Sequence, residues 1–128
     1  MNRYQLEKRM QELEIYSYFY YRKEIKALPQ LLSDDEQLNC ILTGVHEANR
    51  KMLVVTNRRL LIIFAAALSG KDVTVIQRSA VQSYEFEKKL LFSKLSIRTT
   101  TGEDFLFTNV QGSLKELFDW AMKQAIPA

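Results

Sequence analysis

Asn57 and Arg58 separate two apolar runs, Met52–Thr56 and Arg59–Phe64. A short polar turn between two such runs predicts an antiparallel β-hairpin. Residues 60–64 are apolar at every position, so the second strand of this hairpin has apolar side chains on both faces. The interior of a small β-barrel covers only one face of a strand, and the other face needs a cover too. We expect the N-terminal helix to supply that cover, with a second chain as the alternative.

Further strands are predicted around this hairpin, because short apolar or alternating segments recur between turn signals. They lie at residues 38–45, 73–77, 84–87, 91–97 and 105–107. The connections are short enough for all seven strands to pair as an antiparallel meander. The sequence therefore predicts a mainly β fold, and an α+β sandwich is the alternative.

A single amphipathic helix is predicted at the C-terminal end. Ser113 and Glu116 have the spacing of a capping box. The apolar stripe that follows consists of Leu114, Leu117, Phe118, Ala121 and Ala125, and Pro127 stops the helix. Trp120 lies off this stripe and need not face the core. We expect a seven-stranded barrel of two orthogonal antiparallel sheets, capped by this helix.

An extra N-terminal helix is also predicted, because residues 2–27 contain neither Gly nor Pro and are rich in helix formers. It should end at Pro29. Residues 15–21 contain four tyrosines and also suit a strand, but the helix formers on both sides favour a helix. We take residues 1–30 as an N-terminal extension and residues 31–128 as the barrel domain.

The helical period assigns the large side chains of this extension to two faces. The face expected to pack on the barrel holds Leu6, Met10, Leu13, Tyr20 and Tyr21. The outward face holds Ile15, Tyr18 and Phe19. Together with Trp120, these three residues form the candidate interface with a protein partner, because aromatic residues are enriched in such interfaces.

Few residues are available for catalysis or metal binding. The 128-residue chain has room for one domain and contains one cysteine, Cys40, and one histidine, His46. Cys40 lies in a predicted strand and is interpreted as an inert core residue, the alternative being a nucleophile paired with His46. Residues 34–36 are all acidic and could hold a metal, but Ser33 and Glu36 repeat the capping-box spacing and favour a helix start. We expect no enzyme activity, no metal and no cofactor.

No segment predicts secretion or a membrane span. The first residues are charged throughout, and no apolar stretch of a signal peptide follows them. The most apolar run, Leu60–Leu68, is far shorter than the ~20 residues that a spanning helix needs. With Cys40 left without a disulfide partner, we expect a cytoplasmic protein, with a position at the membrane periphery as the alternative.

The basic residues are concentrated in the middle of the chain. The net charge is +3, and residues 50–102 hold ten basic residues against three acidic ones. Arg50, Lys51 and Arg58 are the candidate contacts for an anion or a lipid headgroup. Arg59 is expected to be structural, pairing with carboxylates or turn carbonyls across the barrel.

The hairpin segment Leu53–Phe64, with Thr56-Asn57-Arg58-Arg59 at its turn, resembles that of the bacterial pleckstrin-homology-like (bacterial PH) domain family, which is related in pattern to GRAM domains. Leu32–Leu38 is similar to the family's lead-in to its first strand, and Val75–Tyr84 is similar to a downstream stretch. The resemblance covers residues 31–126. It implies a PH-like barrel and no catalytic activity.

These observations predict a non-enzymatic interaction module. The leading hypothesis is protein binding, including self-association. The alternative is peripheral membrane or anionic-lipid binding through the basic strand-loop zone around Arg50–Arg59. Nucleic acid is not an expected partner, because acidic residues accompany the lysines near Phe92.

Overall fold

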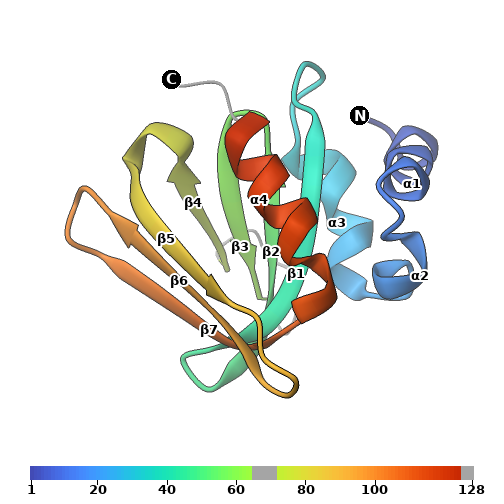
Figure 1. The fold of residues 1–128 in the computed structure, drawn as a ribbon. Coiled ribbons are helices and arrows are strands. Elements are labelled where there is room, and N and C mark those ends of the chain that lie inside the picture. Colours follow the sequence, from blue (N-terminus) through green and yellow to red (C-terminus); the bar gives the residue numbers. More distant parts are fainter. Residues whose placement is uncertain (65–71, 125–128) are drawn as a thin grey trace.

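The computed structural model describes residues 1–64 and 72–124 (Figure 1). The end of the apolar run Leu60–Leu68 therefore lies outside the described residues. The same holds for Ala125 and Pro127, which were expected to complete the C-terminal helix.

Three short helices stand where one N-terminal helix was expected. They are α1 (Arg3–Glu12), α2 (Tyr16–Phe19) and α3 (Lys23–Leu31). Asn2 caps α1 by accepting a hydrogen bond from the backbone N–H of Gln5 at 2.8 Å. Glu14 has a φ of 60°, and this left-handed conformation separates α1 from α2. Pro29 lies inside α3, which ends two residues later, because a proline removes only one backbone hydrogen bond near a helix end.

Leu6 and Met10 are buried, as expected of the face that packs on the barrel, but the predicted division into two helical faces is wrong for most residues after the break at Glu14. Ile15 and Phe19, expected to point outward, are 0% and 1% exposed. Tyr20 and Tyr21, expected on the barrel, are 50% and 67% exposed. The period of 3.6 residues per turn holds only within one continuous helix. After the break at Glu14, a residue's position in the sequence therefore no longer gives the face on which it lies. Residues 15–21 are mostly helical, as favoured, but through a helix of four residues.

Seven strands form one antiparallel sheet in the order β4-β3-β2-β1-β7-β6-β5. Their bounds are β1 (Leu38–His46), β2 (Asn49–Thr56), β3 (Arg59–Ile63), β4 (Val73–Gln77), β5 (Val81–Glu87), β6 (Ser93–Thr99) and β7 (Asp104–Val110). The predicted hairpin is β2–β3, with Val54 opposite Leu61. Leu91 was placed in a strand by the alternation pattern, but β6 begins only at Ser93.

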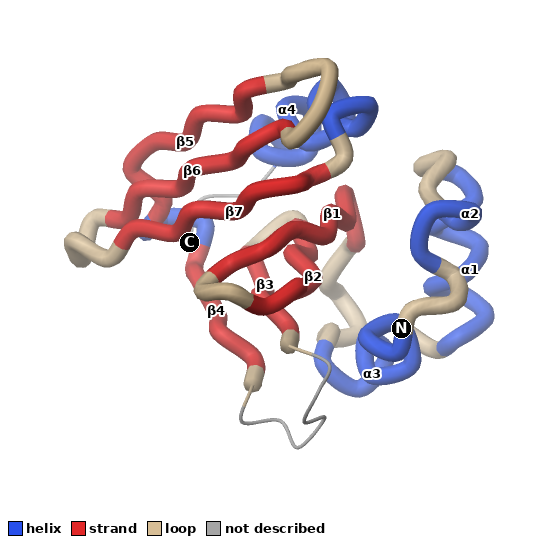
Figure 2. The backbone as a smooth tube through the Cα atoms, turned by 90° about the horizontal axis from the view of Figure 1, so that it is seen from below, coloured by secondary structure: helices blue, strands red, loops and turns tan. Residues whose placement is uncertain are grey.

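The sheet folds into two halves whose strands cross at a steep angle (Figures 1 and 2). One half holds β1–β4 and the other holds β5–β7. They join where Val45 of β1 pairs with Thr108 of β7. At Gly44 a Cβ atom would lie 2.7 Å from Cγ1 of Val110 and 3.0 Å from the carbonyl oxygen of Thr108. Glycine is therefore needed for the two strands to approach this closely.

Strands β1 and β3, and β2 from Met52 onward, are buried on both faces, whereas β6 alternates between buried and exposed residues. Helices α1–α3 lie along the outer side of the β1–β3 half (Figure 2). Their buried side chains, including Leu6, Ile15 and Phe19, belong to the same apolar core as β1–β3. The expected cover by the N-terminal segment is confirmed, and it is intramolecular.

Helix α4 (Lys115–Gln124) closes the open side of the barrel, after a short turn, η3 (Gly112–Leu114). Phe118 is fully buried, with its ring 5.2 Å from that of Tyr84 and 5.8 Å from that of Phe86 on β5. The Tyr84 hydroxyl donates to Asp119 at 3.0 Å. Burial, together with this carboxylate, raises the pKa of Tyr84 to about 12. The capping helix is confirmed, although it begins at Lys115 rather than next to Ser113.

Candidate functional site

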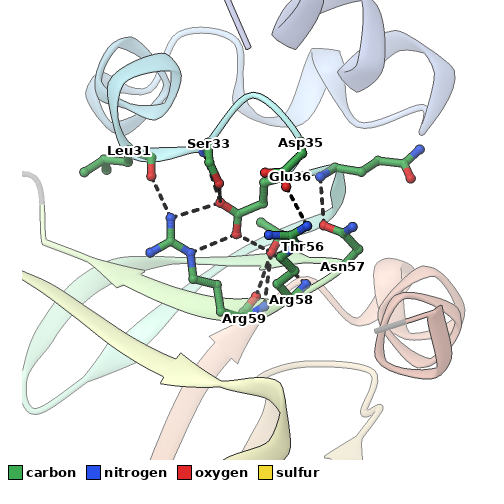
Figure 3. A network of polar contacts seen from close by, with 9 residues as sticks. Leu31, Ser33, Asp35, Glu36, Thr56, Asn57, Arg58 and Arg59 are labelled. Atoms are coloured by element: carbon green, nitrogen blue, oxygen red, sulfur yellow. Dashed lines mark hydrogen bonds and ion pairs between the residues drawn. The ribbon is translucent and has the colours of Figure 1, made fainter. Parts of the chain in front are cut away.

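The β2–β3 hairpin is joined to the segment before β1 by an ion pair (Figure 3). Nε of Arg59 lies 2.8 Å from Oε2 of Glu36, and Nη2 lies 2.9 Å from Oε1. Nη2 also donates to the carbonyl oxygen of Leu31 at the end of α3, at 2.7 Å. Arg59 thus contacts both a carboxylate and a main-chain carbonyl, which are the partners expected of a structural arginine. Its effect on stability stays a prediction.

The other turn residues contact the same segment. The Thr56 hydroxyl donates to Oε2 of Glu36 at 2.6 Å and accepts from the backbone N–H of Arg59 at 3.1 Å. Asn57 and Gln37 exchange two hydrogen bonds, one of which uses the Asn57 side chain (Figure 3). The Thr-Asn-Arg-Arg sequence of the hairpin therefore serves to hold residues 33–37 in place.

Glu36 is buried and ionised. Burial raises the pKa of its carboxyl, but hydrogen bonds from Arg59, Thr56 and the Ser33 backbone outweigh burial and hold the pKa below its usual range. The same pairing, with the Glu36 hydrogen bond as its main cause, raises the pKa of Arg59. The predicted helix start at Ser33 is wrong, since Ser33 and Glu36 close a turn and residues 34–37 are not helical.

The predicted anion site is divided between two ends of the sheet. Arg50 and Lys51 lie at the start of β2, and Arg58 lies in the turn after its end. Thr56 lies six residues after Arg50, a distance of about 20 Å in an extended strand. Arg50 donates to the Thr43 hydroxyl at 3.2 Å, Nζ of Lys51 lies 3.9 Å from a Glu47 oxygen, and Arg58 lies 2.6 Å from an Asp35 oxygen. The three cations do not converge on one ligand position.

Cys40 and His46 do not form a catalytic pair. Both lie on β1, six residues apart, so their backbones are about 20 Å apart. Cys40 is fully buried, and burial raises the pKa of its thiol, which opposes formation of a thiolate. His46 packs against the rings of Phe105 and Phe107, and Nδ1 lies 3.1 Å from the carbonyl oxygen of Leu106. These contacts fix the imidazole ring in the fold.

Acidic side chains do not gather into a metal site in the part of the chain that the structure describes. Within residues 1–64 and 72–124, no group of three or more His, Cys, Asp or Glu side chains could hold a metal ion. Asp35 and Glu36 pair with different arginines, Arg58 and Arg59. The described helices include none that is long and apolar enough to cross a membrane.

Of the four residues of the candidate protein interface, the structure leaves two accessible. Ile15 and Phe19 belong to the core, whereas Tyr18 and Trp120 are 38% and 41% exposed. The Tyr18 hydroxyl lies 3.0 Å from that of Ser113, just before α4. Tyr18 and the beginning of the C-terminal helix therefore lie side by side.

One exposed feature was missed in the sequence. Leu90, Leu91 and Phe92 form the tip of the β5–β6 hairpin and are 99%, 69% and 65% exposed. The sequence feature that could have indicated this tip is the end of the alternating pattern of β5. Three apolar residues follow one another there, directly after Lys88 and Lys89. A continuous strand pattern would have placed a polar residue among them.

Comparison with known proteins yields one family and several similar folds. A family model described as bacterial PH domain matches residues 32–121 of the chain. The crystal structure of a pleckstrin homology domain from Shewanella amazonensis SB2B is 18% identical, with a TM-score of 0.53, over 82% of this chain and 89% of that one. The C-terminal domain of an unknown protein from Leishmania infantum is 17% identical, with a TM-score of 0.59, over 77% of this chain and 91% of that one. Identities this low show a shared fold alone. No curated protein shows significant sequence similarity to the chain.

Proposed function

The chain belongs to the bacterial PH domain family, whose fold typically serves as an interaction module, and we propose that this protein associates with a second copy of itself through the exposed face of α4. The PH-like barrel expected from the sequence is the fold found. The family is generally non-catalytic, and the separation of Cys40 from His46 supports a role without catalysis.

The observation that carries the proposal is the exposed position of Trp120 on a charged helix face. Trp120 is 41% exposed, and tryptophan is one of the residue types most enriched at the centres of protein interfaces. Glu116 precedes it by four residues and Lys123 follows it by three, so all three share one side of α4. Glu116 and Lys123 are both exposed. The face thus has an aromatic centre with opposite charges at its two ends.

Such a face is complementary to itself. Two α4 helices packed antiparallel around a two-fold axis near Trp120 would place Glu116 of each copy opposite Lys123 of the other. The two tryptophans would meet at the centre, where interface residues contribute most of the binding energy. Tyr18 lies beside the start of α4 and would extend the contact at its edge.

Molar mass measured by light scattering over a range of concentrations tests the proposal. Trp120→Ala should weaken the dimer by at least about tenfold, as expected for a central interface residue. Glu116→Lys should also weaken it, because each Lys123 would then face a like charge. Adding Lys123→Glu to Glu116→Lys should restore association, since the charges are exchanged but remain complementary.

The matched control is Tyr4→Ala, which removes an aromatic side chain that is 73% exposed on α1. It should leave the dissociation constant unchanged, and thermal melting should show that every variant is folded. A wild-type protein that remains monomeric at its highest soluble concentration would contradict self-association. So would a double charge exchange that associates no better than Glu116→Lys alone.

A further inference from the structure

The β5–β6 hairpin ends in three consecutive apolar side chains that lie mostly in water. Leu90 is 99% exposed, Leu91 69% and Phe92 65%. Scattered apolar residues are normal on a protein surface, but three in a row at a projecting tip are not explained by packing. None of the three contributes to the apolar core. Their exposure therefore calls for an external partner.

The tip is held in a defined shape. Ser93 is 3% exposed, and its hydroxyl accepts from the backbone N–H of Lys89 at 3.0 Å and lies 3.2 Å from the Lys89 carbonyl oxygen. Phe92 has a φ of 61°, a conformation that is unfavourable for an aromatic residue. The hydrogen bonds of Ser93 and the left-handed backbone of Phe92 thus define the shape of the turn at the tip.

Basic residues surround the tip on both sides. Lys88 and Lys89 precede it and Lys94 follows it, and all three are exposed. The acid nearest in sequence is Glu87, whose carboxylate lies 3.5 Å from Nζ of Lys89, with both side chains about half exposed. An exposed pair of this kind is weak, so Lys89 remains able to bind another anion. An open groove at the base of the tip is lined by Lys88 and Lys89 together with the tip residues Leu90 and Phe92.

We infer that the β5–β6 tip docks on an anionic lipid bilayer. Leucine and phenylalanine side chains enter the boundary between headgroups and acyl chains, and lysines beside them bind the phosphates and carboxylates above it. A projecting apolar tip can be buried in a deformable bilayer without any complementary pocket. Lysines on both sides match a surface that is negative all around the insertion point. This site is separate from the predicted cations Arg50, Lys51 and Arg58.

Co-sedimentation with vesicles tests the inference. The full chain should bind vesicles of equal parts phosphatidylcholine and phosphatidylserine at low salt, and bind pure phosphatidylcholine vesicles much more weakly. Leu90→Ser with Leu91→Ser should weaken binding by at least about tenfold, because the inserted area is lost. Lys88→Glu with Lys89→Glu should weaken binding by at least about tenfold as well. Both variants should melt like the wild type, since the altered side chains are exposed.

The matched control is Arg50→Glu with Lys51→Glu, which makes the same charge change at the other candidate site. It should retain most of the binding. A second readout places one tryptophan at the tip, as Leu90→Trp in a Trp120→Phe background. Its emission should shift to the blue when anionic vesicles are added.

Three results would overturn the inference. The first is a wild-type protein that does not sediment with anionic vesicles at low salt. The second is a loss of binding in the Arg50 and Lys51 variant with none in the tip variants. The third is an unshifted tryptophan emission in the Leu90→Trp protein despite vesicle binding, which would mean that the tip stays in water and is free for a protein partner instead.

Discussion

Arg59 binds the carboxylate of Glu36 through two nitrogens, at 2.8 Å and 2.9 Å, and thereby joins the β2–β3 hairpin to the chain before β1. The Glu36 side chain is 1% exposed and that of Arg59 is 24% exposed. The carboxylate is therefore almost removed from water and depends on its donors, whereas the guanidinium keeps some hydration. The turn of the β2–β3 hairpin thus includes a largely buried ion pair.

Arg59→Ala should lower the free energy of unfolding by about 3 kcal/mol, because it leaves the buried charge of Glu36 without its main partner. Arg58→Ala removes a neighbouring arginine whose pair with Asp35 is exposed on both sides, at 51% and 63%. Exposed pairs contribute about 0–1 kcal/mol, so this variant should unfold almost like the wild type. Urea denaturation measures both. Equal small losses for the two variants would show that the Arg59–Glu36 pair is not structural.

Glu36→Gln should make the protein less stable at neutral pH and also less sensitive to acid. The pKa of Glu36 is lowered in the folded protein, so its carboxylate stabilises the fold above the unfolded pKa of about 4.3. That contribution is lost as the pH falls through 4.3 toward the lower folded pKa. The wild type should therefore lose more stability than Glu36→Gln on acidification, as measured by thermal melting.

The two proteins share every other carboxylate, including Asp119, so the difference between their melting curves isolates Glu36. If the melting temperatures of the two proteins changed in parallel at all pH values, the pKa of Glu36 would be the same in the folded and the unfolded protein.

The hairpin and most strands could be predicted because their apolar patterns match their burial. Residues 60–63 are apolar on both faces, and the structure covers both. The N-terminal faces could not be predicted, because the helical period assumes one continuous helix. Glu14 has a positive φ, and this could not be predicted because glutamate rarely adopts that conformation. The helical period therefore does not hold for the residues after Glu14. Four of them were assigned to the wrong face, and Tyr18 is exposed as expected.

The candidate sites were harder to predict, because closeness in sequence is not closeness in space. Arg50 and Arg58 are near each other in the chain, but a strand separates them by its whole length. Leu91 matches the alternating pattern of β6, but it lies in the loop before that strand, which begins at Ser93. By contrast, the pairing of Arg59 with a carboxylate could be expected from its place between a turn and a buried strand, since such a charge needs a nearby partner.

Gly44→Ala should destabilise the barrel at the crossing of β1 and β7. The added Cβ would lie 2.7 Å from Cγ1 of Val110 and 3.0 Å from the backbone oxygen of Thr108. Relieving such a clash requires a shift of the backbone, and we expect a loss of about 1–3 kcal/mol. Adding Val110→Ala removes the closest of these contacts, so the two losses should not be additive in urea denaturation. Additive losses would show that Gly44 is not crowded by Val110.

The double substitution Ile15→Ser with Phe19→Ser should unfold the domain rather than dissociate an intact one. Both side chains are almost completely buried, and truncating one such residue typically costs about 2–5 kcal/mol. Two losses of this size approach the total stability of an ordinary domain, about 5–15 kcal/mol. The matched control is Tyr20→Ser with Tyr21→Ser, which alters the exposed neighbours and removes two aromatic contacts, the stacking of Tyr20 on Tyr16 and the edge contact of Tyr20 with Tyr21, worth about 1 kcal/mol each. Thermal melting should separate the two pairs clearly. If the Ile15 and Phe19 variant melted like the wild type, α2 would not be packed on the core, and the outer face of β1–β3 would need another cover.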